Sequence, residues 1–190
     1  MPDNARGALG SVYRITGDFL RQRGLFDEVK AKLSPESRRL LEKPPFPFAW
    51  QSSVPLEEIE KLLHARDPKL PAELGLAAAE SLSSTVIAPV LKMALSLFGQ
   101  TPAALFGNLD RFYSMVVRGF TFEYAAAGPK EGTVKARIEG GRVHASVFAQ
   151  LRGNLNLIYR LSGATGTVGE PVVLRQDDSG AEITLAVRWD

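Results

Sequence analysis

The pattern of apolar and polar positions divides the chain near residue 118. Before this point apolar residues recur at intervals of three and four, which is typical of amphipathic helices. After it apolar and polar residues alternate, which is typical of half-buried strands, and one helical stretch at 143–162 interrupts them. We therefore expect an α+β fold in a single domain, 1–190. A helical N-terminal lobe of about 1–117 packs on a C-terminal antiparallel sheet of about 118–190, whose elements follow the order β-β-α-β-β.

The least charged part of the chain spans residues 81–109, where Lys92 is the single charge. Helices of about 71–82 and 84–97 are expected here as a buried pair, because such a helix is apolar on most sides. A kink is expected at Pro89, since proline removes a backbone hydrogen bond within a helix. Serine, threonine and proline interrupt the apolar run, and a transmembrane helix needs about 20 predominantly apolar residues. The sequence therefore predicts no membrane span.

Two further stretches of the N-terminal half carry expectations that the structure can check. Residues 9–15 combine β-branched and aromatic residues between glycines, which predicts a short strand. The helix predicted from Pro55 has an apolar stripe, and the carboxylates beside that stripe are expected to form a solvated face. These carboxylates are Glu57, Glu58 and Glu60.

The segment 44–50 contains three prolines, which exclude a helix. Phe46, Phe48 and Trp50 alternate in it, so in an extended chain they point the same way. One interpretation is a loop that these aromatic residues pin to the core. The other is a docking segment for a protein partner.

Composition narrows the classes of function. The 190 residues are 45% hydrophobic and carry a net charge of +2, which is too weak to indicate nucleic-acid binding. Cysteine is absent, which excludes disulfides, thiolate metal sites and thiol catalysis. The first residues lack the apolar core of a signal peptide, so we expect a cytoplasmic protein.

No pattern of catalytic or metal-binding residues stands out. The two histidines, His64 and His144, have no second histidine or carboxylate at the helical spacing that metal ligands use. No phosphate-binding glycine loop and no GxSxG nucleophile motif occurs. The sequence therefore predicts no metal site and no enzyme.

The order of the predicted elements resembles a ligand-binding superfamily. That superfamily unites heme-NO-binding domains, 4-vinyl-reductase-type domains and the Bet3-like subunits of vesicle-tethering complexes. Within it, the chain looks like a paralogous family abundant in myxobacteria, through Trp50, Glu73-Leu74-Gly75 and Val187-Arg188-Trp189. The resemblance implies a scaffold that often holds an apolar ligand, often pairs with itself and regulates a partner.

One local segment can be compared with the heme-NO-binding domains. Their Asn-Leu-Asp-x-Leu-His segment supplies the histidine that binds iron, and residues 108–113 read Asn-Leu-Asp-Arg-Phe-Tyr, with Tyr113 in the place of that histidine. The Tyr-x-Ser-x-Arg element that holds heme propionates in that family has no counterpart, although tyrosinate binds heme iron in other folds. From this comparison the sequence predicts no heme and no other cofactor.

Together these observations favour a non-enzymatic sensory or regulatory domain that binds a small apolar ligand between the helical lobe and the sheet. Its pocket is expected to involve Leu91, Leu95, Phe98, Leu105, Leu109, Phe112 and Tyr113. The simpler interpretation is that these residues only fill a core. The alternative function is a structural or adaptor module that forms a homodimer, or binds another protein, through Phe46, Phe48 and Trp50.

Overall fold

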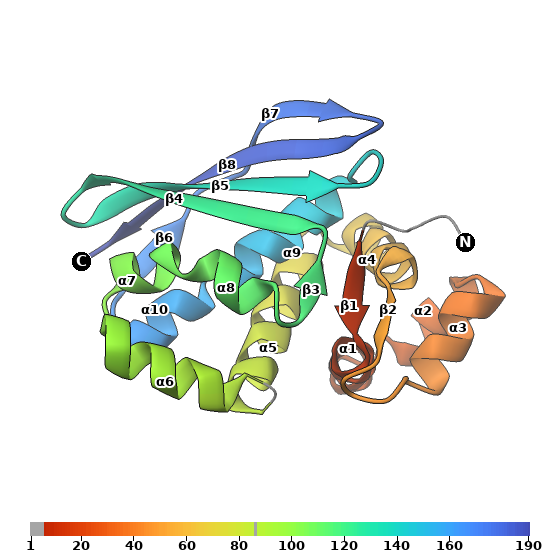
Figure 1. Cartoon of the computed structure of the whole chain (residues 1–190). Helices are drawn as coiled ribbons and strands as arrows, with labels where there is room; N and C mark the ends of the chain where they lie inside the picture. The colour runs from red at the N-terminus through yellow and green to blue at the C-terminus, as the bar shows by residue number, and fades with distance from the viewer. Residues whose placement is uncertain (1–5, 86) are drawn as a thin grey trace.

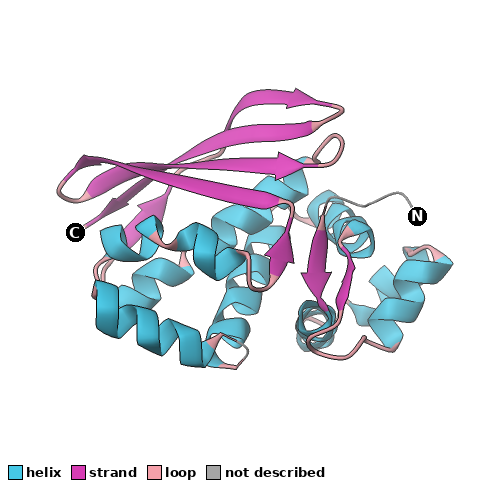
Figure 2. Cartoon of the chain, viewed as in Figure 1, coloured by secondary structure: helices cyan, strands magenta, loops and turns pink. Residues whose placement is uncertain are grey.

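The structure, a computed structural model, describes residues 6–85 and 87–190, without the side chains of Val90, Ala94 and Phe98. A twisted antiparallel sheet forms one layer, and helices pack against one of its faces (Figure 1). A second, smaller sheet and the first helices of the chain lie beside this unit (Figure 2). The α+β class, the helical N-terminal region and the C-terminal antiparallel sheet are confirmed.

The large sheet follows the alternation in the sequence. Its strands are β4 (Phe120–Gly128), β5 (Glu131–Glu139), β8 (Gly180–Trp189) and β6 (Gly166–Val168), in that order, and β7 (Val172–Asp177) also pairs with β8. Val134 lies opposite Leu185, and Ala136 opposite Ile183. All four are fully buried, because alternate residues of each strand point toward the helices.

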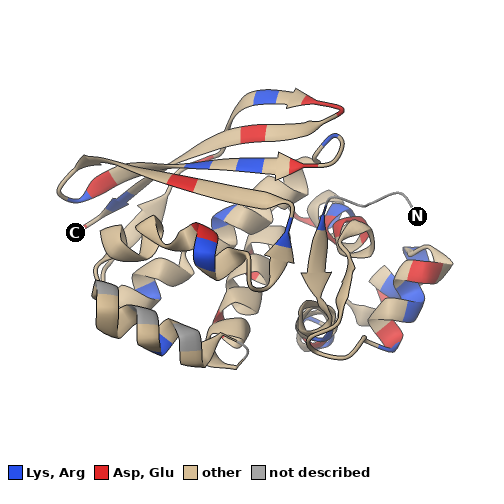
Figure 3. Ribbon diagram, viewed as in Figure 1, with Lys and Arg blue, Asp and Glu red and all other residues tan. Residues whose placement is uncertain are grey.

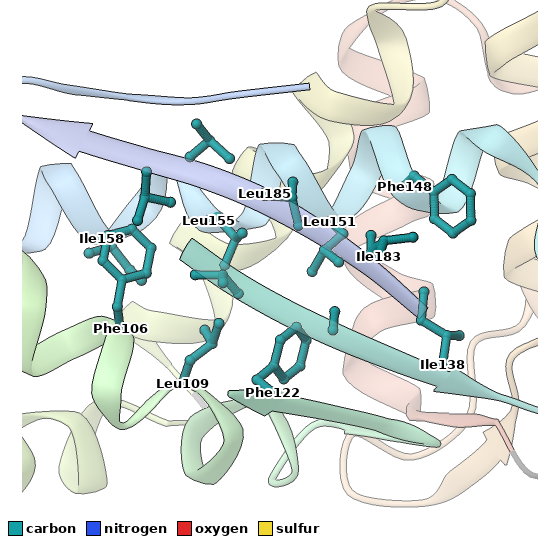
Figure 4. Packing of buried hydrophobic residues seen from close by; sticks show 14 of the residues in the cluster. Phe106, Leu109, Phe122, Ile138, Phe148, Leu151, Leu155, Ile158, Ile183 and Leu185 are labelled. Atoms are coloured by element: carbon teal, nitrogen blue, oxygen red, sulfur yellow. The ribbon is translucent and has the colours of Figure 1, made fainter. Parts of the chain in front are cut away.

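The predicted helix between these strands is divided in two. α9 (Ala145–Leu155) and α10 (Leu157–Ser162) meet at Asn156, whose side chain donates to the carbonyl of Arg152. The inner faces of both helices pack on the sheet (Figure 4). This core also receives Phe106 and Leu109 from the N-terminal half, so both lobes contribute to one core.

The N-terminal region contains β1 (Gly7–Leu9), α1 (Gly10–Gln22), α2 (Phe26–Lys32), α3 (Pro35–Glu42), β2 (Trp50–Ser52) and α4 (Val54–Arg66). β1 lies between β2 and β3 (Val117–Arg118) in the small sheet. The strand predicted at 9–15 is wrong beyond Leu9, since α1 begins at Gly10. Val12, Thr16 and Phe19 are buried at helical spacing, and this periodicity outweighs the local strand preference of the segment.

The central helices are α5 (Leu70–Ser84), α6 (Ala88–Phe98), α7 (Pro102–Gly107) and α8 (Leu109–Tyr113). The kink expected at Pro89 does not occur, because this proline occupies the first turn of α6, where no hydrogen-bond donor is needed. α6 is also not a buried helix, since Met93 and Leu97 are exposed. No helix among the described residues is long and apolar enough to span a membrane.

Charged residues are unevenly distributed in the ribbon. They gather on α2 and α3 at one end and along the strands of the large sheet, while α7 carries none (Figure 3). The neighbouring helices α5, α6, α8 and α10 carry one or two charged residues each.

Candidate functional site

A cavity of about 130 Å³ lies between the helical lobe and the sheet-plus-helix lobe. Aliphatic and aromatic side chains of α5, α6, α7, α8, α9 and α10 form most of its wall. Five of the predicted pocket residues line it, namely Leu91, Leu105, Leu109, Phe112 and Tyr113. Leu95 packs against the core cluster but does not line the cavity. The side chain of Phe98 lies outside the described part of the structure.

Tyr113 is positioned by the segment that the sequence comparison singled out. The Asp110 carboxylate accepts a hydrogen bond of 2.8 Å from the backbone N–H of Phe122, which attaches α8 to β4. The Asn108 side chain donates to the carbonyl of Ala104 at the junction of α7 and α8. With α8 held on the sheet, the ring of Tyr113 packs against that of Phe122, with centroids 4.7 Å apart.

The hydroxyl of Tyr113 belongs to a polar end of the cavity. It accepts a hydrogen bond of 2.8 Å from Asn154 Nδ2 on α9. Burial raises the pKa of Tyr113 far above its usual range, the Asn154 bond lowers it in part, and the nearby Glu60 raises it further. Tyr113 is therefore a neutral phenol at physiological pH, with a proton that it can donate.

Glu60 of α4 is the second polar group at this end. Its side chain is 4% exposed, it lines the cavity, and Oε2 has no hydrogen-bond partner among the described residues. Burial raises its pKa to about 8, the nearby Glu57 acts in the same direction, and a hydrogen bond from Gln150 opposes the shift. The carboxyl therefore keeps its proton at neutral pH.

Glu57 and Glu60 correct the sequence prediction of a solvated acidic face, because both are buried. The Arg6 guanidinium binds both carboxylate oxygens of Glu57, at 2.9 and 3.0 Å, and also donates to the carbonyl of Glu139. The Ser53 hydroxyl donates to the same carboxylate. Only the third carboxylate of the group, Glu58, is partly solvated.

The polar residues at the cavity were missed because their partners are distant in sequence. Gln150 and Asn154 lie one turn apart on α9, on the side that faces α4 and α8. The periodicity of the sequence predicts a helical stretch at 143–162 but gives no role to the amide side chains on it. The buried carboxylate on α4 and the amides on α9 can be assigned to one site only when the two helices are known to pack together.

The predicted interaction residues divide into two kinds. Phe46 and Phe48 are 86% and 71% exposed, whereas Trp50 is half-buried in β2 with the Arg118 guanidinium 3.8 Å above its ring. The three side chains therefore do not form one continuous exposed patch. Whether Phe46 and Phe48 bind a partner stays a prediction.

The two histidines are brought together although no spacing rule links them. The rings of His64 and His144 are 5.5 Å apart at right angles, and His144 caps the start of α9. Within the described residues there is no group of three or more histidines and carboxylates placed to hold a metal ion.

Comparison with solved structures shows the same fold in heme proteins. The Fe(II) unliganded H-NOX protein from K. algicida superposes with a TM-score of 0.65 at 12% identity, covering 96% of each chain. An oxygen-binding H-NOX domain related to soluble guanylate cyclases gives a TM-score of 0.65 at 9% identity, covering 95% of this chain and 94% of that one. No protein-family model matches the sequence, and none of the curated proteins does. The likeness therefore shows the H-NOX fold, and the finer resemblance to a myxobacterial family stays a prediction.

These neighbours contradict the expectation that the chain has no cofactor and binds no heme. A further one, from a study of heme redox potential and porphyrin distortion, has a TM-score of 0.62 at 10% identity, covering 95% of this chain and 99% of that one. The prediction gave too much weight to Tyr113 at the histidine position. The cavity contains two oxygen groups that could face an iron, Tyr113 Oη and Glu60 Oε2, and tyrosine is an established heme ligand.

Proposed function

We propose that this chain is a non-enzymatic sensory domain that binds a ligand in the cavity between its helical lobe and its sheet. The observation that carries the proposal is a mostly apolar cavity whose lining includes the neighbouring polar groups of Glu60 and Tyr113. Ligand sites are typically apolar cavities with a few polar groups that orient the ligand. The shared fold with H-NOX domains adds support.

Heme is the ligand associated with these structural neighbours, and the residues present allow a specific form of this hypothesis. Tyr113 would face the iron, and the apolar side chains of α5, α6 and α10 would surround the porphyrin. A bound iron supplies a site for a diatomic gas, as in the oxygen-binding neighbour. The cavity is close to the size of an engineered cavity of about 150 Å³ that binds benzene, so heme binding requires its walls to move apart.

The heme hypothesis is tested by titrating the purified protein with hemin and recording the absorption spectrum. We expect a stoichiometric shift of the Soret band that is lost or displaced in Tyr113→Phe. This variant removes only the hydroxyl and keeps the ring on Phe122. The matched control is Tyr124→Phe, a tyrosine of β4 that does not line the cavity. An identical spectrum in wild type and Tyr113→Phe would reject Tyr113 as the iron ligand.

Binding in the cavity, whatever the ligand, is tested by filling it. Ala79 of α5 lines the cavity and is only partly buried, so its replacement by phenylalanine can extend a ring into the space. We expect Ala79→Phe to fold and to weaken the binding of small aromatic molecules at least tenfold. The control is Ala77→Phe, on the same helix but not among the lining residues.

A further inference from the structure

The polar end of the cavity contains a buried acid that lacks a cationic partner. Arg6 pairs with Glu57 through two hydrogen bonds, so the charges of these two residues compensate each other. Glu60 forms no ion pair with any described residue and leaves Oε2 without a partner. Buried carboxylates are normally paired, because an isolated charge is costly to remove from water.

Charged and polar groups from several elements of the fold surround Glu60. On its own helix lie Glu57, which disfavours its charge, and Lys61, which is exposed and favours it weakly. Arg6 approaches from the start of β1, Gln150 from α9 and Tyr113 from α8. His64, one turn further along α4, lies against His144. Once Glu60 has lost its proton, a positive charge next to Oε2 would balance the cluster.

We propose that the cavity recognises a primary or secondary amine carried on a small apolar body, with the ammonium group paired to the Glu60 carboxylate. The apolar body would lie against Leu91, Leu105 and Leu109, which line the remaining space. The Tyr113 hydroxyl, held by Asn154, offers an oxygen to a second ammonium proton. This inference rests on the proposed ligand-binding function and adds the chemical class of the ligand.

Binding of such an amine is coupled to the release of a proton. Glu60 holds its proton until about pH 8, whereas an alkylammonium is already charged in solution at neutral pH. When the ammonium enters, the Glu60 proton leaves to solvent and an ion pair remains. Affinity should therefore rise about tenfold for each pH unit up to about pH 8 and then level off.

The probes are benzylamine, benzyl alcohol and toluene, which share a ring and differ in the head group. By isothermal titration calorimetry at pH 8 we expect benzylamine to bind at least tenfold more tightly than benzyl alcohol. Benzylamine should lose about tenfold in affinity between pH 7 and pH 6. At pH 7 its binding should release about one proton, measured by comparing two buffers of different ionisation enthalpy. Glu60→Gln should abolish the preference, whereas Glu58→Gln should keep it.

The possible failures differ from one another. Equal binding of benzylamine and benzyl alcohol, or an amine preference that survives Glu60→Gln, would overturn the amine proposal and leave the cavity as a ligand site. If toluene, the other two probes and hemin all fail to bind, the proposed function fails as well. Should Glu60→Gln not fold, the pH dependence and proton release of the wild type still decide, because a neutral head group produces neither.

Discussion

At the scale of single residues, Glu60 makes the stability of the protein depend on pH. A carboxyl whose pKa is raised to about 8 in the folded state binds a proton that the unfolded chain has already lost above its usual pKa of about 4.3. Folded protein then binds more protons than unfolded protein, so stability falls as pH rises from about 4.3 to 8. Above about pH 8 the contribution of Glu60 to the free energy of unfolding no longer changes.

We predict that Glu60→Gln flattens this part of the stability curve. The wild type should lose at most about 1.4 kcal/mol of unfolding free energy per pH unit through Glu60, and the variant, which has no proton to lose, should not. Urea denaturation at pH 5, 6, 7 and 8 measures the difference. Glu58→Gln is the control. Burial raises the pKa of Glu58, but hydrogen bonds from Ser37 and Ser34 outweigh it and lower the pKa below its usual value, so the contribution of Glu58 to stability is lost only at pH values below that usual pKa.

The Arg6–Glu57 pair is a second residue-scale feature, with side chains only 10% and 11% exposed. Removing one member leaves a buried charge without a partner. We expect Arg6→Ala to destabilise the protein by about 3–5 kcal/mol, the range for broken buried pairs. Replacing both residues by methionine should recover most of this loss, because two apolar side chains leave no uncompensated charge. Thermal unfolding of the two variants at pH 7 compares them, and equal losses would contradict the argument.

At the scale of elements, the crossing of α5 and α9 places the polar residues of α9 beside α4 and α8. Two glycines allow the helices to come this close. A Cβ on Gly75 would lie 2.2 Å from the carbonyl oxygen of Gln150, and a Cβ on Gly153 would lie 1.9 Å from that of Ala72. Because both obstacles are backbone atoms, a side chain at either position must separate the helices.

We predict that Gly75→Ala and Gly153→Ala each cost about 3 kcal/mol of stability, at the upper end of the range for overpacking. Both should also weaken ligand binding, since separated helices move Gln150 and Asn154 away from the cavity. The matched control is Gly107→Ala in α7, where a Cβ meets no atom within 4 Å. There alanine should be neutral or stabilising, because it costs less conformational entropy than glycine in a helix. Chemical denaturation of the three variants provides the comparison.

The same elements show how far the sequence could be interpreted. Strands β5 and β8 were predictable because their alternation is strict and one face is buried. The predictions for α1 and α6 were wrong because each rested on a local feature of the sequence. β-branched residues suggested a strand in place of α1, and Pro89 suggested a kink in α6, whereas contacts with the rest of the fold determine both helices. Five of the predicted pocket residues line the cavity, and whether they bind a ligand stays a prediction. Glu60, Gln150 and Asn154 depend on helix contacts that the sequence does not encode locally.

At the scale of the whole molecule, Phe46 and Phe48 are exposed aromatic residues, and exposed apolar side chains can form a contact with another protein. We propose that they promote formation of a homodimer or a complex with a partner. The mass measured by light scattering should then rise with concentration in the wild type and stay monomeric in the double variant Phe46→Ser, Phe48→Ser. Trp50→Ala is unsuitable as the variant, because Trp50 packs under Arg118. A wild type that remains monomeric throughout would reject the homodimer.

The cavity lies between two lobes, and its walls persist only if these lobes fold as one unit. Arg6 donates to the carbonyl of Glu139, Asn154 donates to Tyr113, and α5 crosses α9 with little space between the backbones. We therefore expect one cooperative transition for the chain. Its two tryptophans provide separate reports, since Trp50 lies in the N-terminal lobe and Trp189 at the end of β8.

Two single-tryptophan variants allow the unfolding of each lobe in urea to be followed by fluorescence. Trp189→Phe keeps Trp50 and reports on the N-terminal lobe, and Trp50→Phe keeps Trp189 and reports on the C-terminal lobe. We expect each fluorescence transition to coincide with that variant's own circular dichroism transition, because contacts across the cavity couple the lobes. If the fluorescence of one lobe changes before the secondary structure of the whole chain, the lobes unfold separately and the chain is two domains. If the lobes are coupled, a ligand that binds in the cavity should raise the urea midpoints of both transitions together, since it contacts groups of both lobes.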